Sequence, residues 1–202
     1  HNKKVLLRVD FNVPLETNKN TITITDDWRI QSSIPTINLL LEKKARIIIC
    51  THIGRPRGKY SEDLTIGPIA QHLSQLLKTK VHEANDSIGN DVEILVNQLQ
   101  ESSILILQNI RFYSGEDKNS PTFSKTLSKP YDIFINDAFG VAHRENSSTV
   151  GVTQYLPSYG GLLMKKEIEV LNHLTKSAPS PRTAIIGGAK IADKLLLLNN
   201  IA

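Results

Sequence analysis

Short apolar runs recur along the chain, and polar residues follow each of them. Five runs rich in Ile, Leu, Val or Phe predict strands: 5–9, 45–51, 104–110, 132–136 and 183–186. The middle runs are almost unbroken, as in strands that are buried on both faces. The pattern therefore indicates a sheet that is covered on its two sides.

Helical periodicity separates these runs. Apolar residues three or four positions apart predict one helix through Ile30, Ile34, Ile37 and Leu41 and another through Ile69, Leu73, Leu76 and Leu77. Asp26 and Asp27 are the expected caps of the first helix, and Pro35 predicts that it starts late or bends. Since strands and helices alternate, we expect an α/β fold with a doubly wound, mostly parallel sheet in a Rossmann-like three-layer arrangement.

The end of the chain suggests a change of unit. An amphipathic stretch at 162–174 precedes a linker at 175–181 that is rich in Ser, Pro and Thr, and the strand predicted at 183–186 then opens a new unit. The chain begins without Met and stops within an apolar helical pattern, so we expect that both ends are cut.

Composition narrows the class of protein. The 202 residues are 40% hydrophobic and 22% charged, as in ordinary globular proteins. A single cysteine, Cys50, excludes an internal disulfide framework, and no apolar run approaches the ~20 residues of a membrane helix. The net charge of +4 fits an anionic small molecule as readily as nucleic acid, so the placement of the charges must decide.

Polar and mainly basic residues follow the predicted strands. They are Asp10 and Asn12 after the first, His52 and Arg55 after the second, Asn109 and Arg111 after the third, and Asp137, His143 and Arg144 after the fourth. Each has an ordinary explanation as a turn residue, a structural histidine or a solvated charge. Ligands of open α/β sheets bind at the carboxyl edge, however, and Arg29 at the start of the first helix could face it too. Together these residues predict an anion-binding site.

The fifth run leads into a different pattern. Gly187 and Gly188 stand where a helix would start, and Lys190 and Lys194, four residues apart, would share one face of that helix. The pattern suits a phosphate, although glycine pairs also serve plain turns. The chain has no P-loop string, no GxGxxG after a strand, no GxSxG and no HExxH.

Five motifs in order resemble the phosphoglycerate kinase family: RVDFNVP at 8–14, THIGRP at 51–56, NIRF at 109–112, NDAFGVAHR at 136–144 and GGAKIADK at 187–194. The resemblance covers the whole chain but only about the amino-terminal half of that two-lobed enzyme. It implies a phosphoglycerate-binding lobe at 1–160, the first of two lobes. An interdomain helix and linker at 161–182 and the truncated start of the nucleotide-binding lobe at 183–202 would follow.

The resemblance also assigns roles to residues. The implied substrate contacts are Asp10, Asn12, Arg29, His52, Arg55, Arg111 and Arg144, and the implied nucleotide contacts are Gly187, Gly188, Lys190 and Lys194. Arg29, Lys190 and Lys194 are the implied catalytic residues, while Arg8 and His143 match the surrounding basic patch. Asn146 departs from the family, which commonly has a second histidine there, and this departure removes a possible positive charge from the edge of the expected site.

The implied reaction is reversible phosphoryl transfer between 1,3-bisphosphoglycerate with ADP and 3-phosphoglycerate with ATP, in glycolysis or carbon fixation. Mg²⁺ is expected with ATP or ADP, and no protein ligand to a metal is expected within the chain. The resemblance favours a monomeric cytoplasmic enzyme that binds neither nucleic acid nor membranes, with a plastid left open.

Two alternatives to a complete kinase come from the chain itself. A partial chain could be a lobe that binds phosphoglycerate without turnover. A nucleic-acid-binding module would use the net positive charge, but only 5% of the residues are aromatic.

Overall fold

The structure is a computed structural model that describes residues 2–18 and 21–176. Contacts within the chain divide it into two units, His1–Met164 and Lys165–Ala202. The strand expected at 183–186 lies outside the described residues.

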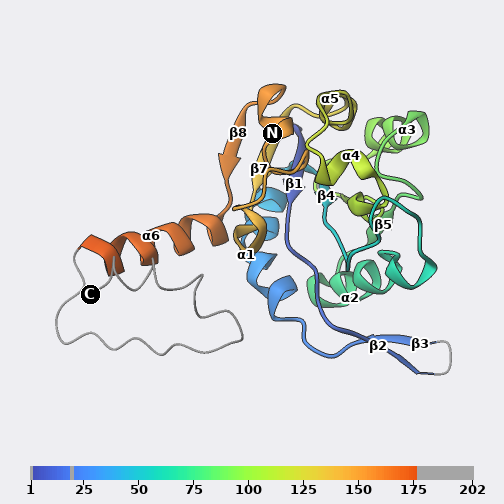
Figure 1. The fold of residues 1–202 in the computed structure, drawn as a ribbon, viewed down its shortest axis with the longest axis horizontal. Helices are drawn as coiled ribbons and strands as arrows, with labels where there is room; N and C mark the ends of the chain where they lie inside the picture. Colours follow the sequence, from blue (N-terminus) through green and yellow to red (C-terminus); the bar gives the residue numbers. More distant parts are fainter. Residues whose placement is uncertain (1, 19–20, 177–202) are drawn as a thin grey trace. The chain divides into compact units, whose positions relative to one another are not determined.

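The first unit is built on a parallel sheet of six strands. Across the sheet their order is β5 (Val81–Glu83), β6 (Ile104–Ile106), β4 (Arg46–Cys50), β1 (Lys4–Arg8), β7 (Ile133–Asn136) and β8 (Ser158–Gly160) (Figure 1). The strands predicted at 5–9, 45–51 and 132–136 are therefore confirmed as β1, β4 and β7, with ends shifted by a residue. Leu6 is paired with Ile48 on one side and Phe134 on the other, so β1 lies inside the sheet.

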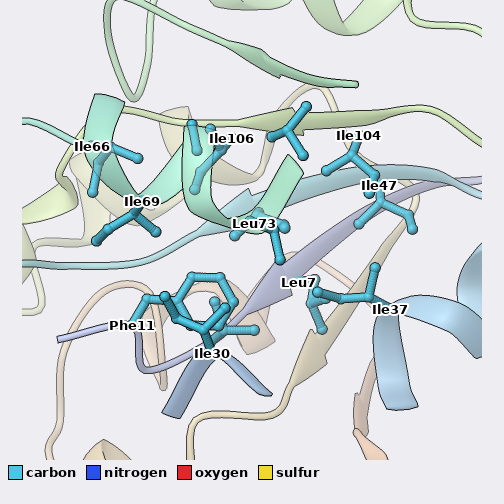
Figure 2. Close-up of a cluster of buried hydrophobic side chains, with 14 of the residues drawn as sticks. Leu7, Phe11, Ile30, Ile37, Ile47, Ile66, Ile69, Leu73, Ile104 and Ile106 are labelled. Carbon is cyan, nitrogen blue, oxygen red and sulfur yellow. The ribbon is translucent and has the colours of Figure 1, made fainter. Parts of the chain in front are cut away.

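Helices cover both faces of this sheet, because the strand residues alternate between two apolar clusters. Leu7 and Ile47 belong to the cluster under α1 (Trp28–Glu42) and α2 (Gly67–Leu77), which Figure 2 shows. Leu6 and Ile48 belong to the opposite cluster, to which α3 (Asn90–Gln98) and α5 (Pro121–Ser128) contribute. The predicted three-layer α/β class is confirmed.

The first helix, α1, starts before Pro35 and includes it. It begins at Trp28 and continues through Pro35, so the prediction of a late start is wrong. Asp26 does act as expected, because its Oδ1 accepts a hydrogen bond from the Trp28 N–H at 2.9 Å. The Asp27 side chain makes no cap hydrogen bond and instead contacts Gln31 Nε2 at 2.7 Å and His72 Nε2 at 2.8 Å.

Several short elements were not predicted. β2 (Leu15–Asn18) and β3 (Thr21–Ile24) form a separate antiparallel hairpin, and β5 and β8 are short edge strands. The run 104–110 is a strand only to Ile106, since the chain then turns into η2 (Ile110–Phe112). The other short helices are η1 (Glu62–Leu64), α4 (Ser114–Asp117), η3 (Phe139–Val141) and η4 (Gly151–Gln154).

The amphipathic stretch at 162–174 is α6 (Leu162–Lys176). Its first turn is fixed by side chains of the sheet unit. The Leu162 N–H donates to Thr36 Oγ1 at 3.0 Å, and the Met164 N–H donates to Oδ1 of the buried Asp137 at 3.1 Å. None of the helices within the described residues is long and apolar enough to cross a membrane.

Candidate functional site

The four inner strands β6, β4, β1 and β7 are parallel neighbours, so the segments that follow them meet at one edge of the sheet. The sequence places most of the predicted site residues in these four segments. Arg29, in the first turn of α1, joins them from the neighbouring helix.

Asp10 is the centre of one end of this edge. Its Oδ2 lies 2.5 Å from Arg29 Nη1, and its Oδ1 accepts from the Asn12 N–H at 3.2 Å and lies 4.0 Å from His52 Nε2. Gly140 of η3 packs directly against this carboxylate, because a Cβ at position 140 would lie 2.7 Å from Asp10 Oδ2. Residues from three predicted motifs therefore meet at one carboxylate.

The peptide of Gly54 links two more predicted residues. Its N–H donates to Asn12 Oδ1 at 2.8 Å, and its carbonyl accepts from Arg111 Nη1 at 2.9 Å. Gly54 has a φ of +60°, a conformation that most side chains disfavour, so this position suits glycine. The turn after β4 thus fixes both Asn12 and the largely buried Arg111.

A hollow of about 550 Å³ adjoins these residues and is lined by four arginines. Its lining residues are Arg55, Arg57, Arg111, Asp117, Arg144, Glu145 and Asn146. Four arginines and two acidic residues line it, and Asp117 Oδ1 lies 3.7 Å from Arg111 Nε. The balance is cationic, so the hollow suits a small anion.

Two of the lining residues add to the sequence reasoning. Arg57 was not predicted, although it stands two residues after Arg55 in the same loop and the spacing could have signalled it. Asn146, where the family commonly has a histidine, is nearly buried, and its Nδ2 donates to the Glu116 carbonyl and to Asp117 Oδ1, both at 3.3 Å. Its side chain therefore holds the loop beside the hollow.

His52 is an uncharged member of this cationic edge. It is 2% exposed, and burial, followed by the charges of Arg8, Arg111, Arg144 and Arg29, lowers its pKa from 6.5 to about 2. His52 is thus neutral at physiological pH and can offer a hydrogen bond but no charge.

Arg8, expected in the surrounding basic patch, lies beneath the edge and is 1% exposed. Its Nε donates to Ser148 Oγ at 2.7 Å, its Nη2 lies 3.1 Å from His52 Nδ1, and its Nη1 donates to the Val9 carbonyl. Ser148 in turn donates its hydroxyl to Glu116 Oε1 at 2.6 Å and its N–H to Glu116 Oε2 at 2.9 Å. A chain of contacts therefore runs from buried Glu116 to His52. His143 is exposed.

The predicted nucleotide residues, Gly187, Gly188, Lys190 and Lys194, lie outside the described residues. Within the described ranges, no three His, Cys, Asp or Glu side chains come together as a metal site would require. Burial raises the pKa of the Cys50 thiol to about 12, so this thiol stays protonated.

Comparisons with known proteins agree with this geometry. The family model described as phosphoglycerate kinase matches residues 1–202. Phosphoglycerate kinases from Dictyoglomus turgidum and Moorella thermoacetica are 47% and 45% identical to 98% and 100% of this chain, which covers 49% and 50% of their lengths. The chain thus spans about half the length of the curated relatives it matches.

Solved structures give the same result. A phosphoglycerate kinase from Pyrococcus horikoshii superposes with a TM-score of 0.88 at 39% identity, covering all of this chain and 50% of that one. The enzyme from Coxiella burnetii gives 0.82 at 36% identity, covering all of this chain and 49% of that one. Because the family model matches the chain from end to end, the chain belongs to the phosphoglycerate kinase family.

Proposed function

We propose that this chain supplies the 3-phosphoglycerate site of a phosphoglycerate kinase, which transfers a phosphoryl group reversibly between 1,3-bisphosphoglycerate with ADP and 3-phosphoglycerate with ATP. The observation that carries the proposal is the hollow lined by four arginines beside Asp10, Asn12 and His52. Its positive charge suits a three-carbon acid with a phosphate at one end, because arginine binds both carboxylate and phosphate with paired hydrogen bonds.

The contacts support a division of roles. Arg55, Arg111 and Arg144 line the hollow and are proposed to bind the substrate phosphate with paired guanidinium donors. Asp10 and Asn12 are proposed to orient the substrate hydroxyl. Since Asn12 Oδ1 already accepts from the Gly54 N–H, its amide Nδ2 supplies the donors for a ligand.

The reaction needs no general base in the ATP-consuming direction, because the attacking carboxylate is ionised at neutral pH. Catalysis then depends on alignment and on positive charge around the transferred group. Arg29, whose side chain is 51% exposed next to Asp10, is the proposed donor on this lobe. Gly187, Gly188, Lys190 and Lys194 are proposed to contact the phosphates of the nucleotide, which enters as its Mg²⁺ complex.

Isothermal titration of the 202-residue chain with 3-phosphoglycerate tests the site. We expect a 1:1 complex whose affinity falls as salt rises, and Arg111→Met should weaken it at least tenfold, the effect of losing charge-assisted hydrogen bonds. Arg46→Met is the matched control, because Arg46 starts β4 at the opposite edge of the sheet. Equal losses from both variants, or no binding by the parent chain, would contradict the proposal.

The finer assignments need separate measurements. A steady-state assay with Mg-ATP and 3-phosphoglycerate distinguishes a kinase from a lobe that binds without turnover. We also propose a monomeric cytoplasmic protein whose partners are these small molecules, in glycolysis or carbon fixation. Sedimentation equilibrium tests the oligomeric state.

A further inference from the structure

The contacts beneath the site fix the hydrogen positions on His52. An arginine side chain can only donate hydrogen bonds. Since Arg8 Nη2 lies 3.1 Å from His52 Nδ1, this ring nitrogen must accept and therefore carries no hydrogen. A neutral imidazole then has its hydrogen on Nε2, the nitrogen that lies 4.0 Å from Asp10 Oδ1 at the site.

The direction of the Arg8 side chain is itself determined by its contacts with Ser148 and the Val9 carbonyl. The Ser148 hydroxyl donates to Glu116 Oε1, so its oxygen is available to accept from Arg8 Nε. The Val9 carbonyl accepts from Nη1, which leaves Nη2 directed at His52. Because the guanidinium group is planar and rigid, fixing two of its nitrogens fixes the third.

These contacts lie in the interior, where solvent water cannot take the place of a lost hydrogen-bond partner. Arg8, Ser148 and Glu116 are each at most 1% exposed. Ser148 separates the two charges, and its hydroxyl and backbone N–H both go to the Glu116 carboxylate. A buried arginine that loses an acceptor leaves an unpaired donor, so removal of any link should redirect the guanidinium group.

We infer that Glu116 and Ser148 are positioning residues that act through Arg8 to hold His52 in its neutral Nε2–H form, with that hydrogen directed at the substrate. This inference rests on the proposed function for the identity of the substrate. It assigns His52 the role of a hydrogen-bond donor among the arginines. His52 then adds no positive charge to that of the guanidinium groups around it.

Nitrogen NMR of the histidine side chains in the free 202-residue chain tests the inference without any ligand. The signals of His52 are identified by their loss in His52→Asn. At pH 7 we expect an unprotonated Nδ1 and a protonated Nε2. An imidazolium, or a hydrogen on Nδ1, would overturn the inference.

Two variants test the links below Arg8. Ser148→Ala removes the acceptor of Arg8 Nε, and Glu116→Gln leaves an amide that can accept at only one of its two terminal atoms. Each should give a mixture of His52 forms and raise the Kd for 3-phosphoglycerate about three- to tenfold, as expected for one hydrogen bond. Ser128→Ala is the matched control, because this buried hydroxyl donates to the Ser124 carbonyl within α5 at 2.7 Å, away from Arg8 and His52.

The outcomes separate this inference from the proposed function. Unchanged His52 spectra in both folded variants would refute the positioning role of Glu116 and Ser148, whatever the affinity for 3-phosphoglycerate. The expected spectra together with no binding of 3-phosphoglycerate would support the positioning role of these residues and reject the proposed substrate. If a variant does not fold, the spectrum of the parent chain still decides whether His52 has the inferred form.

Discussion

The neutrality of His52 predicts a specific dependence of stability on pH. The pKa of His52 falls from 6.5 to about 2 on folding, because the ring is buried among arginines. Below pH 6.5 the unfolded chain therefore binds a proton that the folded chain does not bind. The contribution of His52 to stability is present in full above pH 6.5 and is lost as the pH falls towards 2.

The size of the effect follows from the number of protons that each state binds. While only the unfolded form takes up the proton, the free energy of unfolding decreases by about 1.4 kcal/mol for each pH unit. Half of the unfolded chains already carry the proton at pH 6.5, so the loss between pH 6.5 and pH 4.5 is about 2 kcal/mol. This is a substantial part of the ~5–15 kcal/mol that stabilises a typical domain. The pKa values of Glu116 and Asp137 are raised by burial and act in the opposite direction, so the total slope is smaller.

His52→Asn isolates this contribution, because asparagine does not titrate and its Oδ1 can replace Nδ1 as the acceptor for Arg8. Urea unfolding followed by circular dichroism gives the free energy of unfolding at each pH. The difference in the free energy of unfolding between parent and variant should shift in favour of the variant by about 2 kcal/mol from pH 6.5 to pH 4.5, while the contributions of the other groups cancel. His143→Asn is the matched control for the exchange, since this imidazole is exposed. Parallel curves for the parent and His52→Asn would refute the reasoning.

Three further substitutions test other parts of the site. Gly140→Ala places a Cβ 2.7 Å from Asp10 Oδ2 and should weaken 3-phosphoglycerate binding about tenfold in calorimetry, with unfolding in urea little changed because the carboxylate can move. Gly161→Ala places a Cβ 2.2 Å from the buried Asp137 Oδ1 and should cost about 2 kcal/mol or more in urea unfolding; an unchanged midpoint would contradict this packing. Arg29→Ala, in a two-lobed enzyme that carries this chain, should lower kcat about 100-fold; a loss confined to KM would limit Arg29 to binding.

The sheet could be predicted where its strands are buried. β1, β4 and β7 carry apolar runs, because the inner strands of a covered parallel sheet meet side chains on both faces. The edge strands lack that signal: β5 has one buried residue and β8 has none. The run 104–110 was predicted too long because Asn109, itself buried, uses its side chain to accept from the Arg111 N–H and to start η2. Apolar content cannot distinguish such a turn from a strand.

The sequence indicated which residues gather at the carboxyl edge of the sheet, but it did not indicate the buried residues beneath them. Apart from Arg29, which lies in the first turn of α1, the predicted residues of the described part follow strands, and parallel strands bring their ends together. Glu116 and Ser148 stand 108 and 140 positions from Arg8 and read as ordinary polar residues of surface segments. Only the fold shows that both are buried beneath the carboxyl edge of the sheet. Sequence spacing carries no information on such distant contacts, and a family motif marks Arg8 without saying what holds it.

The position of Arg8 in β1 shows that packing of the sheet alone does not explain an arginine there. Side chains alternate along a strand, so Arg8 points to the same face as Leu6, into the layer that Phe134 and Val152 fill with apolar groups. Burying a charge there costs several kcal/mol, and an apolar side chain of similar volume is often neutral or stabilising at such positions. Packing alone therefore favours an apolar residue at position 8. On the inference above, an arginine is favoured at position 8 because its guanidinium group also reaches His52 Nδ1, where no apolar side chain could donate a hydrogen bond.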